Sequence, residues 1–197
     1  MKRINIKMEG AIKLAISIGL LVLSIVATIR TGNKFIMFGM AASTLGDFNI
    51  MNSRGVLWNP NKDNKSFAYG MICFSIAHLM YVFAMGGHKI FVGIEVLFCV
   101  LIIIMIWGQK DKENFDPLES KVLQVLYAGC IITAAVNALF FFWIVALGYV
   151  LFISSDLTLS ILEKKDPRGQ IAIWALYAPG QVLIISGLLT AIILFTQ

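Results

Sequence analysis

Apolar runs alternate with short polar segments along the whole chain, and each run is close to the length that a helix needs to cross a bilayer. A transmembrane helix requires about 20 mostly apolar residues. Since only Asn137 and its neighbours separate the fifth run from the sixth, a reading with six or eight helices stays open. The pattern favours seven transmembrane helices, at residues 11–29, 35–52, 66–86, 89–108, 119–137, 138–160 and 170–195.

The composition supports a membrane protein rather than a soluble one. Hydrophobic residues make up 59% of the 197 positions and charged residues 14%, whereas soluble domains carry about 25% charged residues. A soluble domain of this length has too little interior to bury that much apolar surface. We therefore expect an all-α polytopic helix bundle that forms a single transmembrane domain over residues 1–197.

Basic residues concentrate in alternate polar segments. With a cytoplasmic N-terminus, twelve of them lie on the inner side and three on the outer side, and Lys13 lies at the inner end of the first span. This positive-inside distribution predicts an odd number of spans and an outward-facing C-terminus, and the net charge of +5 then gives no reason to expect a nucleic-acid partner. The inner residues are Lys2, Arg3, Lys7, Arg54, Lys62, Lys65, Lys110, Lys112, Lys121, Lys164, Lys165 and Arg168; the outer ones are Arg30, Lys34 and Lys89.

Four ionisable residues fall inside the predicted spans: Asp47, His78, Glu95 and Asp156. Each costs about 2.5–3.5 kcal/mol on membrane-insertion scales, so each is a functional candidate. Asp47 and Asp156 lie about one turn from the inner ends of the second and sixth spans, which places them at similar depth. A pair of carboxyl groups in such a site is expected to hold one protonated and one ionised member, as general acid catalysis requires. The alternative is that both side chains reach interfacial water at their helix ends.

Polar side chains on two other spans extend this candidate site. His78 shares a helical face with Phe67, Gly70, Phe74 and Tyr81, so its imidazole must point into the bundle. A direct role and hydrogen bonding between helices are both compatible with that position.

The seventh predicted span carries Trp174, Tyr177 and Gln181 on one face, beside Pro179 and Gly180. Proline removes a backbone donor, which suggests a bend and a pocket here. Glu95 lies near the outer end of its span, and we interpret it as interfacial or interhelical.

Metal chemistry is not predicted. The three cysteines, Cys73, Cys99 and Cys130, lie in apolar runs without a Cys-x-x-Cys pair, so we interpret them as buried structural thiols. Two histidines are too few for a zinc site built from several of them. A metal held by the two aspartates and His78 is a weaker alternative.

Four motifs carry a resemblance to a known family. They are Leu45-Gly46-Asp47, the stripe from Phe67 to Tyr81 with His78, Gly148-x-x-x-Phe152-x-x-Ser155-Asp156, and Tyr177-x-x-x-Gln181. In order and spacing they resemble the lysoplasmalogenase (YhhN-like) family of polytopic membrane hydrolases. Where that family usually has a bulkier, more aromatic stretch between its tyrosine and glutamine, this chain has Ala178-Pro179-Gly180.

The resemblance implies an enzyme of the bacterial cell membrane that cleaves the vinyl ether bond of lysoplasmalogens to a fatty aldehyde and a glycerophospho-choline or -ethanolamine. It implies that Asp47 and Asp156 are the catalytic pair and that no metal or organic cofactor takes part. It also implies a lysophospholipid substrate amid membrane lipids, with the oligomeric state left open. The expected substrate-binding residues are His78, Tyr81, Ser155, Tyr177 and Gln181.

Two other functions stay open at this point. One is a proton-coupled transporter, or a non-enzymatic seven-helix binding protein, in which the aspartates relay protons. The other is an enzyme that acts on a different ether or ester lipid.

Overall fold

The computed structural model describes residues 2–53, 64–109, 117–161 and 167–196. These residues form seven α-helices, as the apolar pattern predicted, and the fold is all-α. The helices are α1 (Lys2–Thr31), α2 (Lys34–Ser53), α3 (Asn64–Ala84), α4 (Lys89–Gly108), α5 (Pro117–Phe141), α6 (Trp143–Ile161) and α7 (Pro167–Thr196). Of the inner basic residues, Arg54, Lys62, Lys110, Lys112, Lys164 and Lys165 lie outside the described residues.

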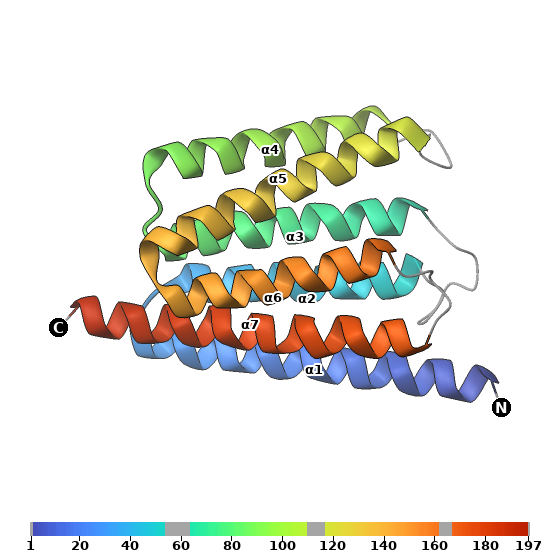
Figure 1. Ribbon diagram of the computed structural model, residues 1–197, viewed down its shortest axis with the longest axis horizontal. Helices are drawn as coiled ribbons and strands as arrows, with labels where there is room; N and C mark the ends of the chain where they lie inside the picture. Colours follow the sequence, from blue (N-terminus) through green and yellow to red (C-terminus); the bar gives the residue numbers. More distant parts are fainter. Residues whose placement is uncertain (1, 54–63, 110–116, 162–166, 197) are drawn as a thin grey trace.

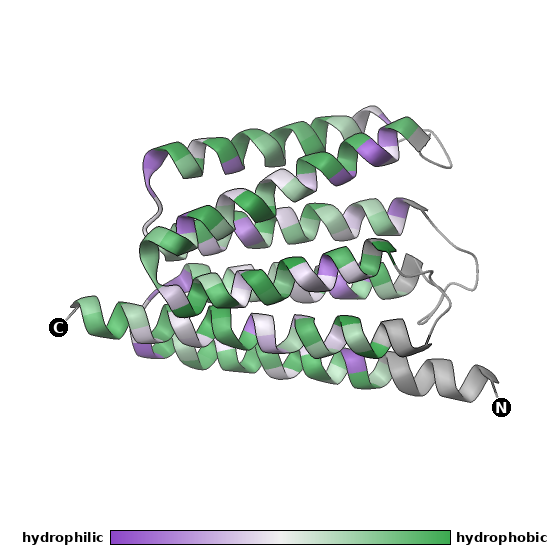
Figure 2. Ribbon diagram, viewed as in Figure 1, coloured by the Kyte–Doolittle hydropathy of each residue, from purple (hydrophilic) through white to green (hydrophobic). Residues whose placement is uncertain are grey.

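Five of the described helices are long and apolar enough to cross a membrane by length and hydropathy: α1, α3, α4, α5 and α7. A shorter apolar helix, Trp143–Leu159, lies within α6. The more polar α2 runs antiparallel to both α1 and α3 (Figure 1). Hydrophobic residues predominate along the helices (Figure 2). Several large apolar side chains are exposed, including Ile29, Trp107 and Phe140, which are at least 70% exposed. These features are those of an integral multi-pass membrane protein.

Six of the helices form a closed ring. In order around it, the packed neighbours are α1, α2, α3, α5, α6 and α7, and α7 packs back against α1. The remaining helix, α4, packs from outside onto α3 and α5, and it lies at the edge of the bundle in Figure 1. Side chains that point into the ring are therefore shielded from lipid by neighbouring helices.

The break between α5 and α6 differs from the prediction. We expected the turn at Asn137, but α5 continues to Phe141 and the break falls at Phe142. Asn137 is buried inside α5, and its side-chain nitrogen lies 3.6 Å from the Met85 sulfur on the neighbouring chain segment. The amide is thus accommodated across the bundle, so it does not end the helix.

Close helix contacts depend on glycines at two places. A Cβ atom on Gly148 of α6 would lie 2.8 Å from the Gly180 carbonyl oxygen of α7, so the two backbones can approach this closely only without side chains. A Cβ atom on Gly46 of α2 would lie 2.8 Å from the Phe74 ring of α3. Gly46 therefore gives the Phe74 ring its place directly beside Asp47.

Candidate active site

Asp47 lies inside the ring and links three helices. Its carboxylate Oδ2 accepts a hydrogen bond from the Ser17 hydroxyl of α1 at 2.7 Å and another from the Tyr177 hydroxyl of α7 at 2.8 Å. The side chain is only 6% exposed. The carboxyl group therefore does not face lipid, and it already has two fixed hydrogen-bond donors.

Asp156 is held in a similar way by the opposite pair of helices. Its Oδ2 accepts a hydrogen bond from the Tyr127 hydroxyl of α5 at 2.8 Å. Asp47 lies thirteen residues after Lys34 and Asp156 thirteen residues after Trp143, the first residues of α2 and α6. At 1.5 Å per residue both aspartates lie about 20 Å along helices that run in the same direction in Figure 1, which agrees with the similar depth predicted for them.

Aromatic rings connect the two carboxyl groups. The Phe74 ring lies 6.4 Å from Tyr127 and 6.3 Å from Tyr177, between centroids, and thus contacts both tyrosines that hold an aspartate. The two aspartates are close enough to interact electrostatically. The buried Asp47 and the partly buried Asp156 therefore adjoin one cluster of aromatic rings.

Tyr81 and Gln181 form a second polar group in the same interior. The Tyr81 hydroxyl donates to Gln181 Oε1 at 3.1 Å, and Gln181 Nε2 donates to the Ser43 hydroxyl at 3.3 Å. Both predicted residues are fully buried. Tyr81 interacts electrostatically with Asp47, and Tyr177 interacts with Gln181. The structure therefore brings these four predicted site residues together.

His78 lies among aromatic rings, and its hydrogen-bond neighbour is a tyrosine and not an aspartate. Its Nδ1 lies 3.5 Å from the Tyr149 hydroxyl, and its ring centroid lies 5.1 Å from Phe152 and 6.2 Å from Tyr127. Its Nε2 has no hydrogen-bond partner among the described residues. The inward direction predicted for the imidazole is confirmed, and one ring nitrogen is available for a further contact.

Ser155 has a different position from its neighbour in sequence. Its hydroxyl donates to the Ile173 carbonyl of α7 at 3.2 Å and is buried there. In the structure as it stands this hydroxyl links α6 to α7. It could still accept a hydrogen bond from substrate, but to donate one it would have to give up the bond to Ile173.

The described residues do not gather Asp47, Asp156 and His78 into a metal-ligand group. The one group whose ligand atoms all lie within 4.8 Å of one another in the described part of the chain consists of Glu95, Cys99 and Cys130. The weaker metal alternative from the sequence therefore has no structural support. Glu95 is fully buried and contacts Cys130 of α5, so its side chain is interhelical and not interfacial.

A hollow of about 510 Å³ lies at the other end of the bundle, at the turn between α3 and α4. Met85, Gly87, His88, Asn137 and Phe140 are among the residues that line it. None of the predicted site residues lines this hollow, so the expected pocket beside Tyr177 and Gln181 is not the same space. Pro179 lies within α7, which is helical from Pro167 to Thr196.

Sequence reasoning missed three residues that contact the site: Ser17, Tyr127 and Ser43. For Tyr127, its position along the helix was a signal that could have identified it. Tyr127 lies ten residues after the start of α5 and Tyr177 ten residues after the start of α7, and both helices start at the same end of the bundle (Figure 1). No comparable signal marks the two serines, because many buried serines bond only to their own helix.

Comparison with protein families decides the identity of this arrangement. The YhhN family model matches residues 8–188, which include most or all of every helix of the ring and both aspartates. The chain belongs to the YhhN family. No curated protein and no solved structure matches it.

As a YhhN family member, the chain places the most polar residues of its predicted motifs inside one ring. Asp47, His78, Tyr81, Tyr177 and Gln181 are at most 6% exposed. They come from three helices that are separated in sequence, α2, α3 and α7, and the partly buried Asp156 comes from α6. The family likeness and the shared interior are independent observations on the same residues.

Proposed function

We propose that the chain is a membrane hydrolase that cleaves the vinyl ether bond of lysoplasmalogens and releases a fatty aldehyde and a glycerophospho-choline or -ethanolamine. The observation that carries the proposal is the pair of aspartates inside one ring of helices, each bonded to a tyrosine hydroxyl. Membership of the YhhN family, which includes lysoplasmalogenases, supports it.

The chemistry requires an acid and a negative charge in one poorly hydrated place. Vinyl ether cleavage begins when an acid transfers its proton to the alkene carbon that does not bear oxygen. The adjacent carbon then carries positive charge shared with the ether oxygen. Water adds to that carbon and loses a proton, and the hemiacetal collapses to an aldehyde and an alcohol. Glycosidases stabilise a similar cation with two carboxyl groups.

The hydrogen-bond pattern supports a division of the two roles. Asp47 accepts two hydrogen bonds and Asp156 one. Because donors favour the ionised form of a carboxyl group, Asp47 is the carboxylate that stabilises the cation and Asp156 is the acid. The proton that the water loses can return to Asp156 and restore the starting state.

The surrounding groups suit a lysolipid. His78 has a ring nitrogen available to water or to a glycerol oxygen, and Tyr81 and Gln181 lie beside Asp47. Lys13 of α1 lies 5.8 Å from the Trp174 ring centroid and interacts electrostatically with Asp47. We assign Lys13 to the lipid phosphate, with the substrate entering from the inner leaflet of the bacterial cell membrane and the N-terminus in the cytoplasm.

The test is aldehyde release by the purified protein in detergent. Wild-type protein should cleave a vinyl ether lysolipid and leave the matched lysolipid with a saturated ether bond intact. Asp47→Asn and Asp156→Asn should each lower kcat by about 10²- to 10⁴-fold, the usual contribution of general acid–base catalysis. Glu119→Gln is the matched control, since Glu119 is an acidic residue outside the ring interior, bonded to Gln109.

Two results would contradict the proposal. One is wild-type turnover in either aspartate variant when the purified variants have wild-type helix content. The other is aldehyde release that does not depend on the vinyl ether bond, which would assign the protein to a different lipid. Absence of turnover together with proton-dependent solute uptake in vesicles would support the transporter alternative instead.

A further inference from the structure

Glu95 is a buried acid that the proposed reaction does not use. It lies on α4, outside the ring, and it is 0% exposed. Neither of its carboxyl oxygens has a hydrogen-bond partner in the described part of the chain. A buried carboxyl group whose oxygens lack hydrogen-bond partners is unfavourable inside a membrane span, and a bound cation would compensate for this.

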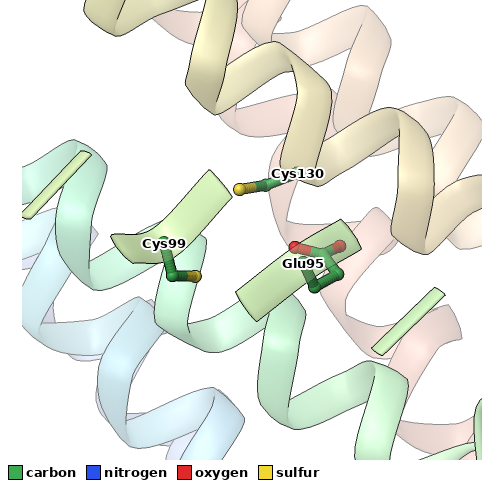
Figure 3. Close-up of side chains that lie close together, drawn as sticks. All are labelled: Glu95, Cys99 and Cys130. Atoms are coloured by element: carbon green, nitrogen blue, oxygen red, sulfur yellow. The ribbon is translucent and has the colours of Figure 1, made fainter. Parts of the chain in front are cut away.

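Two cysteines surround this carboxyl group. Cys99 follows Glu95 by four residues and therefore lies on the same face of α4. Cys130 reaches toward both from α5 (Figure 3). The three ligand atoms all lie within 4.8 Å of one another, and both thiols are less than 9% exposed. Packing of α4 against α5 is tight here, because a Cβ atom on Gly129 would lie 2.8 Å from the Phe98 ring.

We propose that Glu95, Cys99 and Cys130 bind a divalent thiophilic cation, of which Zn²⁺ is the best match, between α4 and α5. Thiolates select soft and borderline metals over Mg²⁺ or Ca²⁺. In a tetrahedral zinc site the ligand atoms lie about 3.5–3.8 Å apart. The present separations need to close by only about 1 Å, which side-chain rotations supply.

Charge favours a divalent cation over a monovalent one. With both thiols and the carboxyl group deprotonated, Zn²⁺ leaves one net negative charge, and with one thiol still protonated the site is neutral. A monovalent copper ion would leave the site more negative in an apolar span, which is less favourable. On binding, the cation replaces the protons of the ligands, which pass to water.

A small polar side chain, Ser75 of α3, lies beside the proposed site. Cys130 interacts with Ser75 of α3, whose hydroxyl donates to the Met71 carbonyl at 2.9 Å. A water molecule bonded to Ser75 would complete four-coordination. The bound cation would then link α4 to the ring through α5, and it would be independent of the aspartates and of the proposed hydrolysis.

The first test uses the wild-type protein, freed of metal with a chelator in detergent, and Cd²⁺ as a spectroscopic probe. We expect one equivalent of Cd²⁺ to produce a thiolate-to-cadmium charge-transfer band that Zn²⁺ removes. Glu95→Gln, Cys99→Ser and Cys130→Ser should each weaken binding by more than about 100-fold, since loss of a partner one shell further out already costs about 10- to 100-fold. Cys73→Ser is the matched control and should bind normally.

The second test needs no variant. Zn²⁺ should slow alkylation of Cys99 and Cys130 in the wild-type protein and leave the alkylation rate of Cys73 unchanged. The proposal is overturned if Cd²⁺ gives no charge-transfer band with the wild-type protein. It is also overturned if Zn²⁺ protects all three cysteines equally or none of them.

Discussion

At the scale of single residues, the tyrosine–aspartate pairs organise the site. Tyr177 holds Asp47 and Tyr127 holds Asp156, each at 2.8 Å. A hydroxyl that donates to a buried carboxyl group fixes the direction of that group as well as its charge. We therefore expect the tyrosines to act as positioning residues, and Tyr127 tests this best because it is the donor to the assigned acid.

Tyr127→Phe should lower kcat for vinyl ether cleavage by about tenfold to a hundredfold. The Tyr127 hydroxyl stabilises the negative charge that forms on Asp156 as it gives up its proton, and a hydrogen bond to a charged group contributes about 1.5–3 kcal/mol. KM and the thermal midpoint should change little, since the ring and its contact with Phe74 remain. Kinetics on purified protein measure this. Tyr69→Phe, at a tyrosine that is 48% exposed on α3, should leave both parameters unchanged. An equal loss of kcat in both variants would contradict the hypothesis that Tyr127 positions Asp156.

Lys13 is the second residue whose role can be separated. Lys13→Met keeps the apolar stem beside Trp174 and removes the charge. KM for the lysolipid should rise by about tenfold, while kcat should fall by much less, because the charge is assigned to binding and not to the chemical step. An unchanged KM with a lower kcat would contradict a role for Lys13 in phosphate binding and would instead indicate that its charge acts on Asp47.

The aspartates could be predicted from the sequence, but most of their partners could not. Depth follows from the position of Asp47 and Asp156 within apolar runs, because a helix advances by a fixed rise per residue. Which helices face each other across the ring is not encoded in that pattern. Ser17 and Ser43 could therefore not be recognised as site residues from the sequence, because each bonds to a residue on another helix.

At the scale of helices, small residues set the distances. Gly148 and Gly180 let α6 and α7 approach until their backbones touch, which places Asp156 and Tyr177 on adjoining helices. The apolar runs predicted the seven helices, but the turn between α5 and α6 was predicted at Asn137 and lies at Phe142. A polar residue in an apolar run resembles a turn in the sequence, because its partner elsewhere in the bundle, here Met85, is not evident there.

Gly148→Ala should destabilise the protein by about 1–3 kcal/mol, since the added methyl group meets backbone atoms of α7 that cannot move independently. The thermal midpoint in detergent should fall by several degrees. Gly93→Ala is the control, because a Cβ atom there has nothing within 4 Å. It should be neutral or slightly stabilising, as alanine favours helix over glycine by about 1 kcal/mol. Equal midpoints for the two variants would contradict the close-contact interpretation.

At the scale of the whole molecule, seven helices that alternate in direction put the two ends of the chain on opposite faces of the bundle (Figure 1). The basic residues predict which face is cytoplasmic, as the positive-inside rule applies to short connections. The same face carries the inner ends of α2 and α6, and therefore the aspartates.

A periplasmically active reporter fused after the C-terminus should be active in bacterial cells, and a reporter that fluoresces only in the cytoplasm should be dark there. Fusions truncated after Gly108, at the end of α4, should give the reverse pattern. If α2, the most polar helix, did not cross the membrane, both signals would be inverted. The same signal at both positions would place the non-crossing helix among α5, α6 and α7.

The bond between Tyr127 and Asp156 has a mechanical consequence. α5 and α6 are joined by the single residue Phe142 at one end, and the Tyr127–Asp156 bond ties the two arms together toward the other end. Asp156 can keep this bond at Oδ2 while its other oxygen engages the substrate, so the two arms stay tied during turnover. Removal of the phenol in Tyr127→Phe should therefore raise hydrogen exchange near the free ends of both arms.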